Sequence, residues 1–252
     1  MLKKITHPLN ILNPDEIIEA VGILKSSNKD HSNSAYSYIT LEEPDKNLLK
    51  ESLNCERVVK IVGVDQISQG FEAKINLTTK ELVSDEIISN QAGPTYTLSE
   101  IFLAIKLTME DFGYQQALEK RGIRDLNLIQ IDPWPGGGFV NKKIKKGNRA
   151  LKAISFLKES EKDNAYARPI QGLIAHIDLT EKKVVEIEDH GIVKVPEAHA
   201  RYDKDGQETL REDLKEIAIT QPGGVGFSVE DNQISWEGWP VSYTHLRAHE
   251  TQ

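Results

Sequence analysis

The chain has 252 residues, of which 38% are hydrophobic and 28% are charged. This length allows one large domain or two ordinary domains with well-buried cores, and the composition argues against wholesale disorder. The formal net charge of −8 provides no surplus of basic groups for nucleic-acid phosphates or an anionic membrane. We therefore expect neither nucleic acid nor a membrane as a partner.

The single cysteine, Cys55, excludes an intrachain disulfide, so we expect the fold to depend on its core. The first eight residues contain no apolar segment of the length that a secretory signal requires. No stretch approaches the ~20 apolar residues of a membrane-spanning helix. These features predict a cytoplasmic location.

The first predicted helix begins after Asn13, a residue suited to capping, with Pro14 at its first position and acidic residues in its first turn. Its apolar residues recur at helical spacing, at Ile17, Val21 and Leu24. Four strand-like segments follow the helix, at residues 35–41, 58–64, 71–77 and 82–88. The third of them alternates apolar with polar residues, which is typical of an antiparallel strand with one exposed face.

A second helix is predicted from Thr97, because Thr97 and Glu100 have the spacing of a capping box. We expect its buried stripe to consist of Leu98, Phe102, Ile105, Met109 and Phe112. Gly113 is expected to interrupt the helix, and Gly122 to end a shorter one as its C-cap. Further strands are predicted at residues 126–131, 150–157, 173–179 and 184–187.

The order of one helix followed by strands therefore occurs twice. Residues 73–83 also align without a gap on residues 175–185, and both segments are typical of a β-hairpin. Convergence on good hairpin chemistry would give the same match, but its place in two helix-first units favours duplication. The predicted fold class is α+β, with two cystatin-like units in which a helix lies on an antiparallel sheet. After them, residues 196–213 are expected to form a polar linker.

Candidate catalytic motifs are few. The segment Pro135–Gly138 has glycines that could cradle phosphate, but it lacks the lysine and the following helix of a P-loop, so we expect a turn. Glu188, Asp189 and His190 are metal-ligand types, but adjacent strand residues point to opposite faces. His245 and His249 have a metal-binding spacing on a helix, but they lie in a tail that we expect to be non-native, residues 241–252.

Residues 131–137 have the sequence IDPWPGG, and residues 163–173 have the sequence DNAYARPIQGL. These two segments resemble the DPWPAG and DN-YAHPIEGL segments of the copper-containing primary-amine oxidases, the topaquinone enzymes, with Arg168 in place of the usual histidine. The remaining matches lie at residues 7–17, 185–196 and 213–222. Together they cover the chain from His7 to Trp239.

The resemblance implies an N-terminal fragment with the two small domains that precede the catalytic β-sandwich. The first α+β domain is expected at residues 1–92, the second at 93–195, and the linker with the truncated start of the sandwich at 196–240. Full-length relatives are homodimers. They use copper and topaquinone to oxidise primary amines with O2 to aldehydes, releasing ammonia and hydrogen peroxide.

The topaquinone and copper motifs of that family, Asn-Tyr and His-x-His, do not occur in this sequence. No catalytic, cofactor-binding or metal-binding residue is therefore carried over, and the chain as given is expected to be inactive and without cofactors. One residue has a candidate role: Tyr166, whose motif position borders the mouth of the amine channel in some relatives. The alternative function is a self-sufficient, non-enzymatic binding protein made of two cystatin-like modules.

Overall fold

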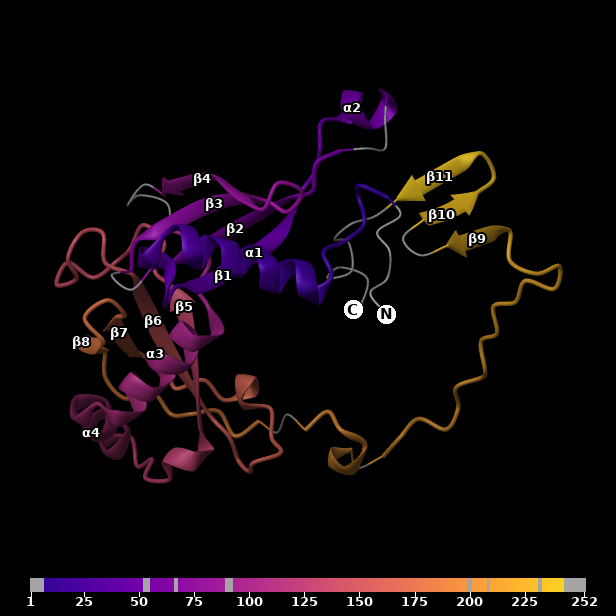
Figure 1. Ribbon diagram of the computed structural model, residues 1–252. Coiled ribbons are helices and arrows are strands. Elements are labelled where there is room, and N and C mark those ends of the chain that lie inside the picture. Colours follow the sequence, from indigo (N-terminus) through magenta and orange to yellow (C-terminus); the bar gives the residue numbers. More distant parts are fainter. Residues whose placement is uncertain are drawn as a thin grey trace. The chain divides into compact units, whose positions relative to one another are not determined.

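The computed structural model describes residues 7–51, 55–65, 68–88, 93–198, 201–207, 209–230 and 233–242. Two compact units are present, one formed by the residues up to Thr95 together with those from Lys215 onward, and one formed by Tyr96–Leu214 (Figure 1). No helix in the described part of the chain is long and apolar enough to cross a membrane. The expected non-native tail lies outside the described residues beyond position 242.

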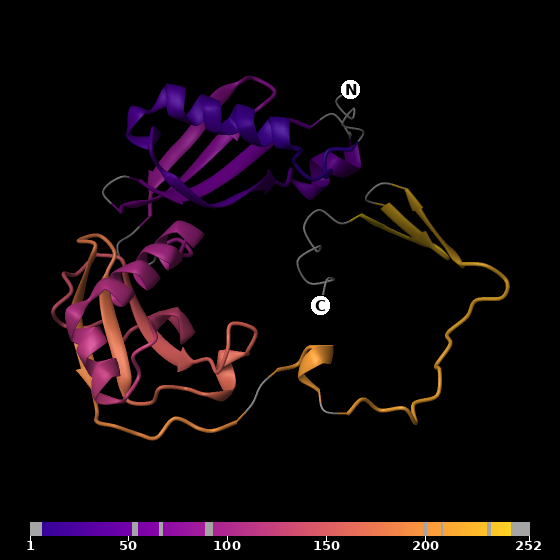
Figure 2. The same ribbon diagram turned by 90° about the horizontal axis from the view of Figure 1, so that it is seen from below.

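In the first unit, helix α1 (Pro14–Ser27) lies along one face of a four-stranded antiparallel sheet of order β1-β2-β3-β4 (Figures 1 and 2). The strands are β1 (Ala35–Glu42), β2 (Val58–Val64), β3 (Gly70–Asn76) and β4 (Glu81–Ile87). Ala20 and Leu24 of α1 are fully buried against this sheet. The helix and the four strands match the sequence prediction to within a residue or two.

Two short elements of this unit were missed by the sequence analysis. They are the 3-10 helix η1 (Lys29–His31) and helix α2 (Lys46–Glu51). Asp45 precedes α2, and its carboxylate accepts a hydrogen bond from the backbone N–H of Asn47 at 2.7 Å. With only six residues, α2 is too short for an apolar stripe, which is the signal that identified the other helices.

In the second unit, helices α3 (Leu98–Glu110) and α4 (Phe112–Lys120) lie on one face of another four-stranded antiparallel sheet, of order β5-β6-β7-β8 (Figure 2). Its strands are β5 (Ile129–Pro135), β6 (Ala150–Leu157), β7 (Leu173–Asp178) and β8 (Lys183–Asp189). The strand predicted at residues 126–131 begins instead as the 3-10 helix η2 (Leu126–Leu128), and β5 extends to Pro135. The α+β class and the antiparallel sheets are therefore confirmed.

The predicted buried stripe of the second helix is wrong for three of its five residues. Leu98, Phe102 and Phe112 are 74%, 65% and 72% exposed, whereas Ala104 and Thr108 are fully buried. The small side chains of the latter pair face the sheet, and the Thr108 hydroxyl donates a 2.8 Å hydrogen bond to the Ala104 carbonyl. The three exposed side chains therefore lie off the helix face that packs on the sheet.

The helix break that we expected at Gly113 lies at Asp111. Asp111 is the C-cap of α3 and the N-cap of α4, where its side chain accepts a hydrogen bond from the Tyr114 N–H at 2.8 Å. Gly113 lies inside the first turn of α4. The predicted role of Gly122 is confirmed, because it has a positive φ of 76° directly after the C-cap Arg121.

After β8 the chain is mostly irregular up to a small antiparallel sheet of order β11-β10-β9 (Figure 1). Its strands are β9 (Phe227–Glu230), β10 (Gln233–Trp236) and β11 (Trp239–Ser242). The 3-10 helix η4 (Lys204–Gly206) interrupts the preceding segment. Ile217 and Ile219 lie in no strand and are 89% and 95% exposed.

The predicted match between the two hairpins is confirmed by their backbones. The β3–β4 register shifts between Lys74 and Ile75, and the β7–β8 register shifts between His176 and Ile177, the two aligned positions. The turn residues also correspond, because Lys80 and Lys182 both have a positive φ, of 62° and 53°. Sequence similarity in this segment thus reflects the same bulge and the same turn.

Both units also share a buried ion pair that joins the helix to the sheet, which we call the Arg–Glu clasp. In the first unit, Nε of Arg57 donates to Glu16 at 2.7 Å, and both side chains are about 10% exposed. Glu16 also closes the capping box of α1 by accepting from the Asn13 backbone N–H at 2.8 Å. Arg57 in turn pairs with the hairpin, because its own N–H donates to Thr78 Oγ1 and its carbonyl accepts from Leu77.

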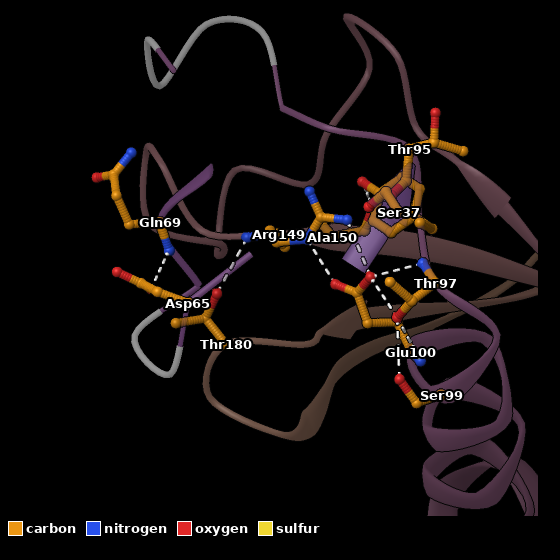
Figure 3. Close-up of polar contacts among 11 residues, drawn as sticks. Ser37, Asp65, Gln69, Thr95, Thr97, Ser99, Glu100, Arg149, Ala150 and Thr180 are labelled. Carbon is orange, nitrogen blue, oxygen red and sulfur yellow. Dashed lines mark hydrogen bonds and ion pairs between the residues drawn. The ribbon is translucent and has the colours of Figure 1, made fainter. Parts of the chain in front are cut away.

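The second unit repeats this clasp with Glu100 and Arg149 (Figure 3). The Arg149 guanidinium makes two hydrogen bonds to the carboxylate of Glu100, which also accepts from the Thr97 N–H at 2.8 Å. Backbone pairing of Arg149 with Thr180 and Leu179 repeats that of Arg57. Burial opposes ionisation of Glu100, but the hydrogen bonds from Arg149 and Thr97 outweigh it and hold the pKa of Glu100 below its usual value.

We predict that Arg57→Met destabilises the first unit by about 3–5 kcal/mol, because it leaves the buried Glu16 carboxylate without its counter-charge. The measurement is native-state hydrogen exchange of β2 and β3, with the second unit and its intact clasp as the internal reference. Lys60→Met is the matched control, since the pair of Lys60 with Glu72 is about one-third exposed and is worth about 0–1 kcal/mol. Equal losses in the two variants would contradict a dominant role of the clasp.

Candidate functional site

Tyr166 lies in the 3-10 helix η3 (Ala165–Ala167), within the loop that joins β6 to β7. Asn164 caps this short helix by accepting from the Tyr166 N–H at 3.0 Å. The loop is attached to β6 by two backbone hydrogen bonds, from Leu157 N–H to the Arg168 carbonyl and from Ile170 N–H to the Ser155 carbonyl. These contacts determine on which face of the β5–β8 sheet the Tyr166 ring lies.

The ring emerges on the face of the β5–β8 sheet that α3 and α4 leave uncovered, which we call the open face. Ile131 and Ala153 belong to the buried core under the helices, so by strand alternation Asp132, Trp134 and Phe156 belong to the open face. Tyr166 contacts two of these residues, as described next. The open face therefore carries the predicted candidate residue.

Four of these residues form a group that we call the aromatic cluster: Asp132, Trp134, Phe156 and Tyr166. One oxygen of Asp132, Oδ2, accepts hydrogen bonds from the Trp134 indole N–H and from the Tyr166 hydroxyl, each at 3.2 Å. The ring of Phe156 meets the ring of Tyr166 edge-on, with a centroid distance of 5.0 Å and an interplanar angle of 74°. Trp134 and Tyr166 are each 56% exposed, so the cluster presents two oriented rings to solvent.

The electrostatics of the cluster follow from that geometry. The pKa of the Tyr166 phenol is raised, first by partial desolvation and then by the negative charge of Asp132 beside it. Its hydroxyl therefore remains a proton donor to Asp132 at neutral pH. A neutral phenol and a neutral indole thus share the oxygen of one carboxylate.

Arg168, which stands where the amine oxidase motif has histidine, attaches the loop of Tyr166 to the segment that follows β8. Its Nε donates a hydrogen bond to the Pro196 carbonyl at 3.2 Å. The substitution therefore retains a hydrogen-bond donor at this position, now on a longer side chain.

Glu188, Asp189 and His190 do not converge on one point, as strand alternation predicted. Glu188 is hydrogen-bonded to His176 at 2.7 Å and to His190 at 2.6 Å. The carboxylate of Asp189 instead accepts two hydrogen bonds from the Arg121 guanidinium. Among the described residues there is no group of three or more His, Cys, Asp or Glu side chains placed to hold a metal ion. His245 and His249 lie outside those residues.

The glycine-rich segment that follows β5 is a turn, as predicted, with Gly137 at a φ of 54°. Asn141 and Lys143 in the loop after this turn are bonded to Glu186 of β8, at 2.5 and 3.0 Å. The hydrogen bond from Asn141, and after it that from Lys143, holds the pKa of Glu186 below its usual value. The loop is therefore held against the sheet by side-chain contacts.

Sequence reasoning located Tyr166 but missed its partners. Asp132 and Trp134 lie within the DPWP segment, and their alternation on a strand was the available signal that they share a face. Their contact with Tyr166 depends on how the β6–β7 loop folds back, which the sequence pattern does not reveal. The Arg–Glu clasp was missed for the same reason, since its partners are 41 and 49 residues apart.

Comparison with known proteins gives the family. Two protein-family models match, "Copper amine oxidase, N2 domain" at residues 7–54 and "Copper amine oxidase, N3 domain" at residues 99–206. The primary amine oxidase of Arthrobacter sp. (strain P1) is 32% identical over 93% of this chain and 36% of its own length. The primary amine oxidase of Klebsiella aerogenes is 29% identical over 98% of this chain and 32% of its own length.

The fold agrees with these matches. The crystal structure of a copper-containing benzylamine oxidase from Hansenula polymorpha matches 93% of this chain and 40% of its own, with a TM-score of 0.75 and 16% identity. The chain belongs to the copper amine oxidase family and contains its N2 and N3 domains. It spans about a third of the length of the curated relatives it matches.

We predict that Asp189→Asn weakens the second unit by about 1 kcal/mol at neutral pH. The hydrogen bonds from Arg121, followed by that from the Gly191 N–H, lower the pKa of Asp189 from 3.8 to about 2. Because the pKa is depressed in the folded state, this stabilisation is present above about pH 4 and is lost as pH falls toward 2.

Urea unfolding of the variant and the parent chain at pH 7 and at pH 2.5 measures the effect, and the difference between them should shrink at the lower pH. Asp203→Asn is the control, since Asp203 pairs with Arg201 in the segment that follows β8, outside the sheet. A difference that stays constant with pH would contradict the assignment to Asp189.

Proposed function

We propose that this chain supplies the N2 and N3 domains of a copper and topaquinone primary-amine oxidase. That enzyme would convert a primary amine, O2 and water into an aldehyde, ammonia and hydrogen peroxide, and we propose that it acts as a homodimer. The observation that carries the proposal is the succession of both domain models in one chain that is 32% identical to a primary amine oxidase over 93% of its length. In this proposal residues 1–92 and 93–195 are the two domains, and residues 196–240 lead into the catalytic β-sandwich.

The residues of this chain do not fit the cofactors of that enzyme. The described residues include no cluster of three metal-ligand side chains, and the sequence contains neither Asn-Tyr nor His-x-His. Copper and topaquinone are therefore assigned to the longer enzyme, and no chemical step is assigned to these two domains.

The alternative, a non-enzymatic binding protein of two helix-on-sheet modules, has one observation in its favour. Each unit has its own buried core, which independent folding requires, and its own Arg–Glu clasp. The small β9–β11 sheet favours the oxidase instead, because Trp236 and Trp239 are 59% and 73% exposed there and suit a larger sheet assembly.

The deciding experiment is to read the gene beyond codon 239. We expect an open frame that continues to an Asn-Tyr motif and a His-x-His motif. A stop codon near position 240 in the native gene would instead support the binding-protein alternative.

The chain as given should bind no stoichiometric copper and form no quinone. The reason is the absence of both cofactor motifs from its sequence. Metal analysis after copper loading, a visible absorption spectrum and an amine-dependent peroxide assay check this expectation. One copper per chain together with a quinone absorption band would contradict it.

We further propose that Tyr166 borders the amine channel of the longer enzyme. Its exposed ring, held by Asp132 and Phe156, supports a role in lining the channel rather than in catalysis. In that enzyme, Tyr166→Ala should change kcat/KM for a bulky arylalkylamine by about tenfold and for methylamine by less than about threefold. Tyr166→Phe keeps the ring and serves as the control; equal effects of Tyr166→Ala on both amines would remove the channel assignment.

A further inference from the structure

We propose that Ser34 is a nucleophile that accepts small acyl groups from activated esters. In this site His31 is the base for the Ser34 hydroxyl, and Asp85 positions the His31 ring. His31 ends η1, Ser34 directly precedes β1, and Asp85 lies on β4, so the site belongs to the first unit. The proposed oxidase function gives none of the three residues a role.

A chain of hydrogen bonds joins the three side chains. Nε2 of His31 lies 3.0 Å from Oδ2 and 3.1 Å from Oδ1 of Asp85, and Nδ1 lies 3.3 Å from Oγ of Ser34. An ionised carboxylate only accepts hydrogen bonds, so the neutral imidazole carries its proton on Nε2. Nδ1 is therefore an acceptor, and the Ser34 hydroxyl donates to it. A nucleophile beside a base that a third group orients is the arrangement that activates serine on unrelated folds.

His31 is held in place by its surroundings. Its side chain is 5% exposed, and its ring lies on Phe71 with a centroid distance of 4.0 Å and an interplanar angle of 39°. The Asn28 side chain donates to Oδ2 of Asp85 at 2.7 Å and caps η1 by accepting from the Asp30 N–H at 3.0 Å. The Asp85 carboxylate is thus fixed where it offsets the positive charge that the His31 ring acquires when Nδ1 takes a proton.

The contact with Ser34 is not needed to attach η1 to β4. His31 and Asn28 already make that attachment through their hydrogen bonds to Asp85. Ser34 lies three residues after His31 in the same turn, and its backbone N–H donates to the His31 carbonyl at 3.3 Å. Its side-chain contact therefore links no distant segments, and what it adds is a hydroxyl placed against a base.

Two neighbouring serines provide an internal comparison. The Ser32 hydroxyl donates to the Lys29 carbonyl, and the Ser37 hydroxyl donates to the Thr95 carbonyl. A carbonyl oxygen does not take up the proton that serine must release, so these hydroxyls lack the base that Ser34 has. Ser34 itself is half-buried, and residues 32 and 33 before it are exposed, so a small ester can approach it from solvent.

The proposed reaction is one acyl transfer. The Ser34 oxygen forms a bond to the carbonyl carbon of the ester while its proton passes to Nδ1 of His31. The bond from that carbon to the leaving oxygen then breaks, and the leaving alkoxide or phenoxide takes the proton from Nδ1. The products are the acyl ester of Ser34 and one alcohol or phenol, and the reaction requires no oxidant or other co-reactant.

The test exposes the whole 252-residue chain briefly to p-nitrophenyl acetate and quantifies the acetyl group on each serine by peptide mass spectrometry. We expect Ser34 to be acetylated about 100-fold faster than Ser32 or Ser37, which is the size of a general-base contribution. In concentrated urea the three rates should converge, because the hydrogen-bond chain requires the folded protein. Equal rates for the three serines in the folded chain overturn the proposal.

His31→Gln removes the base and should lower the Ser34 rate about 100-fold, to the level of Ser32. Asp85→Asn should lower the Ser34 rate at least about tenfold without changing that of Ser32, and Asp85→Glu, which keeps a carboxylate, should restore most of it. Ser32→Ala is the matched control, because it removes a hydroxyl from the same turn and leaves the hydrogen-bond chain intact. A fast Ser34 reaction that survives His31→Gln overturns the proposal.

The comparison of serines within the unaltered chain needs no variant, so it decides the question even if His31→Gln fails to fold. If Asp85→Asn lowers the rates of all three serines alike, Asp85 acts only through the fold and its positioning role is overturned. The acetylation of Ser34 is also independent of the oxidase proposal, because it is measured on this chain alone.

Discussion

The Arg–Glu clasp sets the position of the helix on its sheet in both domains. The glutamate satisfies the first backbone N–H of the helix and neutralises an arginine at the start of a central strand, so one carboxylate serves two elements. A buried charge without a partner is strongly unfavourable, so the helix start and the strand start must lie together in any stable packing. The same arginine pairs through its backbone with the end of the next strand, which adds the hairpin to the constraint.

A helix fixed on one face of a sheet leaves the other face free to vary, and the two domains use that freedom differently. On the first sheet, side chains form a network of opposite charges, in which Lys60 pairs with Glu72 and Lys74 with Glu42. On the second sheet, the corresponding face carries the aromatic cluster and the His176–Glu188–His190 contacts. The core and the clasp occur in both domains, while the open faces are chemically distinct.

The features that the sequence predicted well depend on local spacing. Capping boxes at Asn13 and Thr97 and the hairpin around Lys80 and Lys182 involve residues within a few positions of one another. The prediction of which face of α3 is buried was wrong. The buried face carries the small residues Ala104 and Thr108, which contribute little to a search for large apolar residues at helical spacing. The clasps and the contact of Asp132 with Tyr166 were out of reach, since each depends on a long-range approach of two segments.

The motif match located Tyr166, but the structure explains why an aromatic residue is useful at that place. A three-residue 3-10 turn attached to the sheet edge cannot bury a large side chain, so the ring stays exposed unless something else orients it. Asp132 and Phe156 supply that orientation from β5 and β6, and Arg168 attaches the far end of the loop to Pro196. The exposed ring is thus held by two neighbouring side chains, on a loop that Arg168 fixes, and keeps its position without a buried environment.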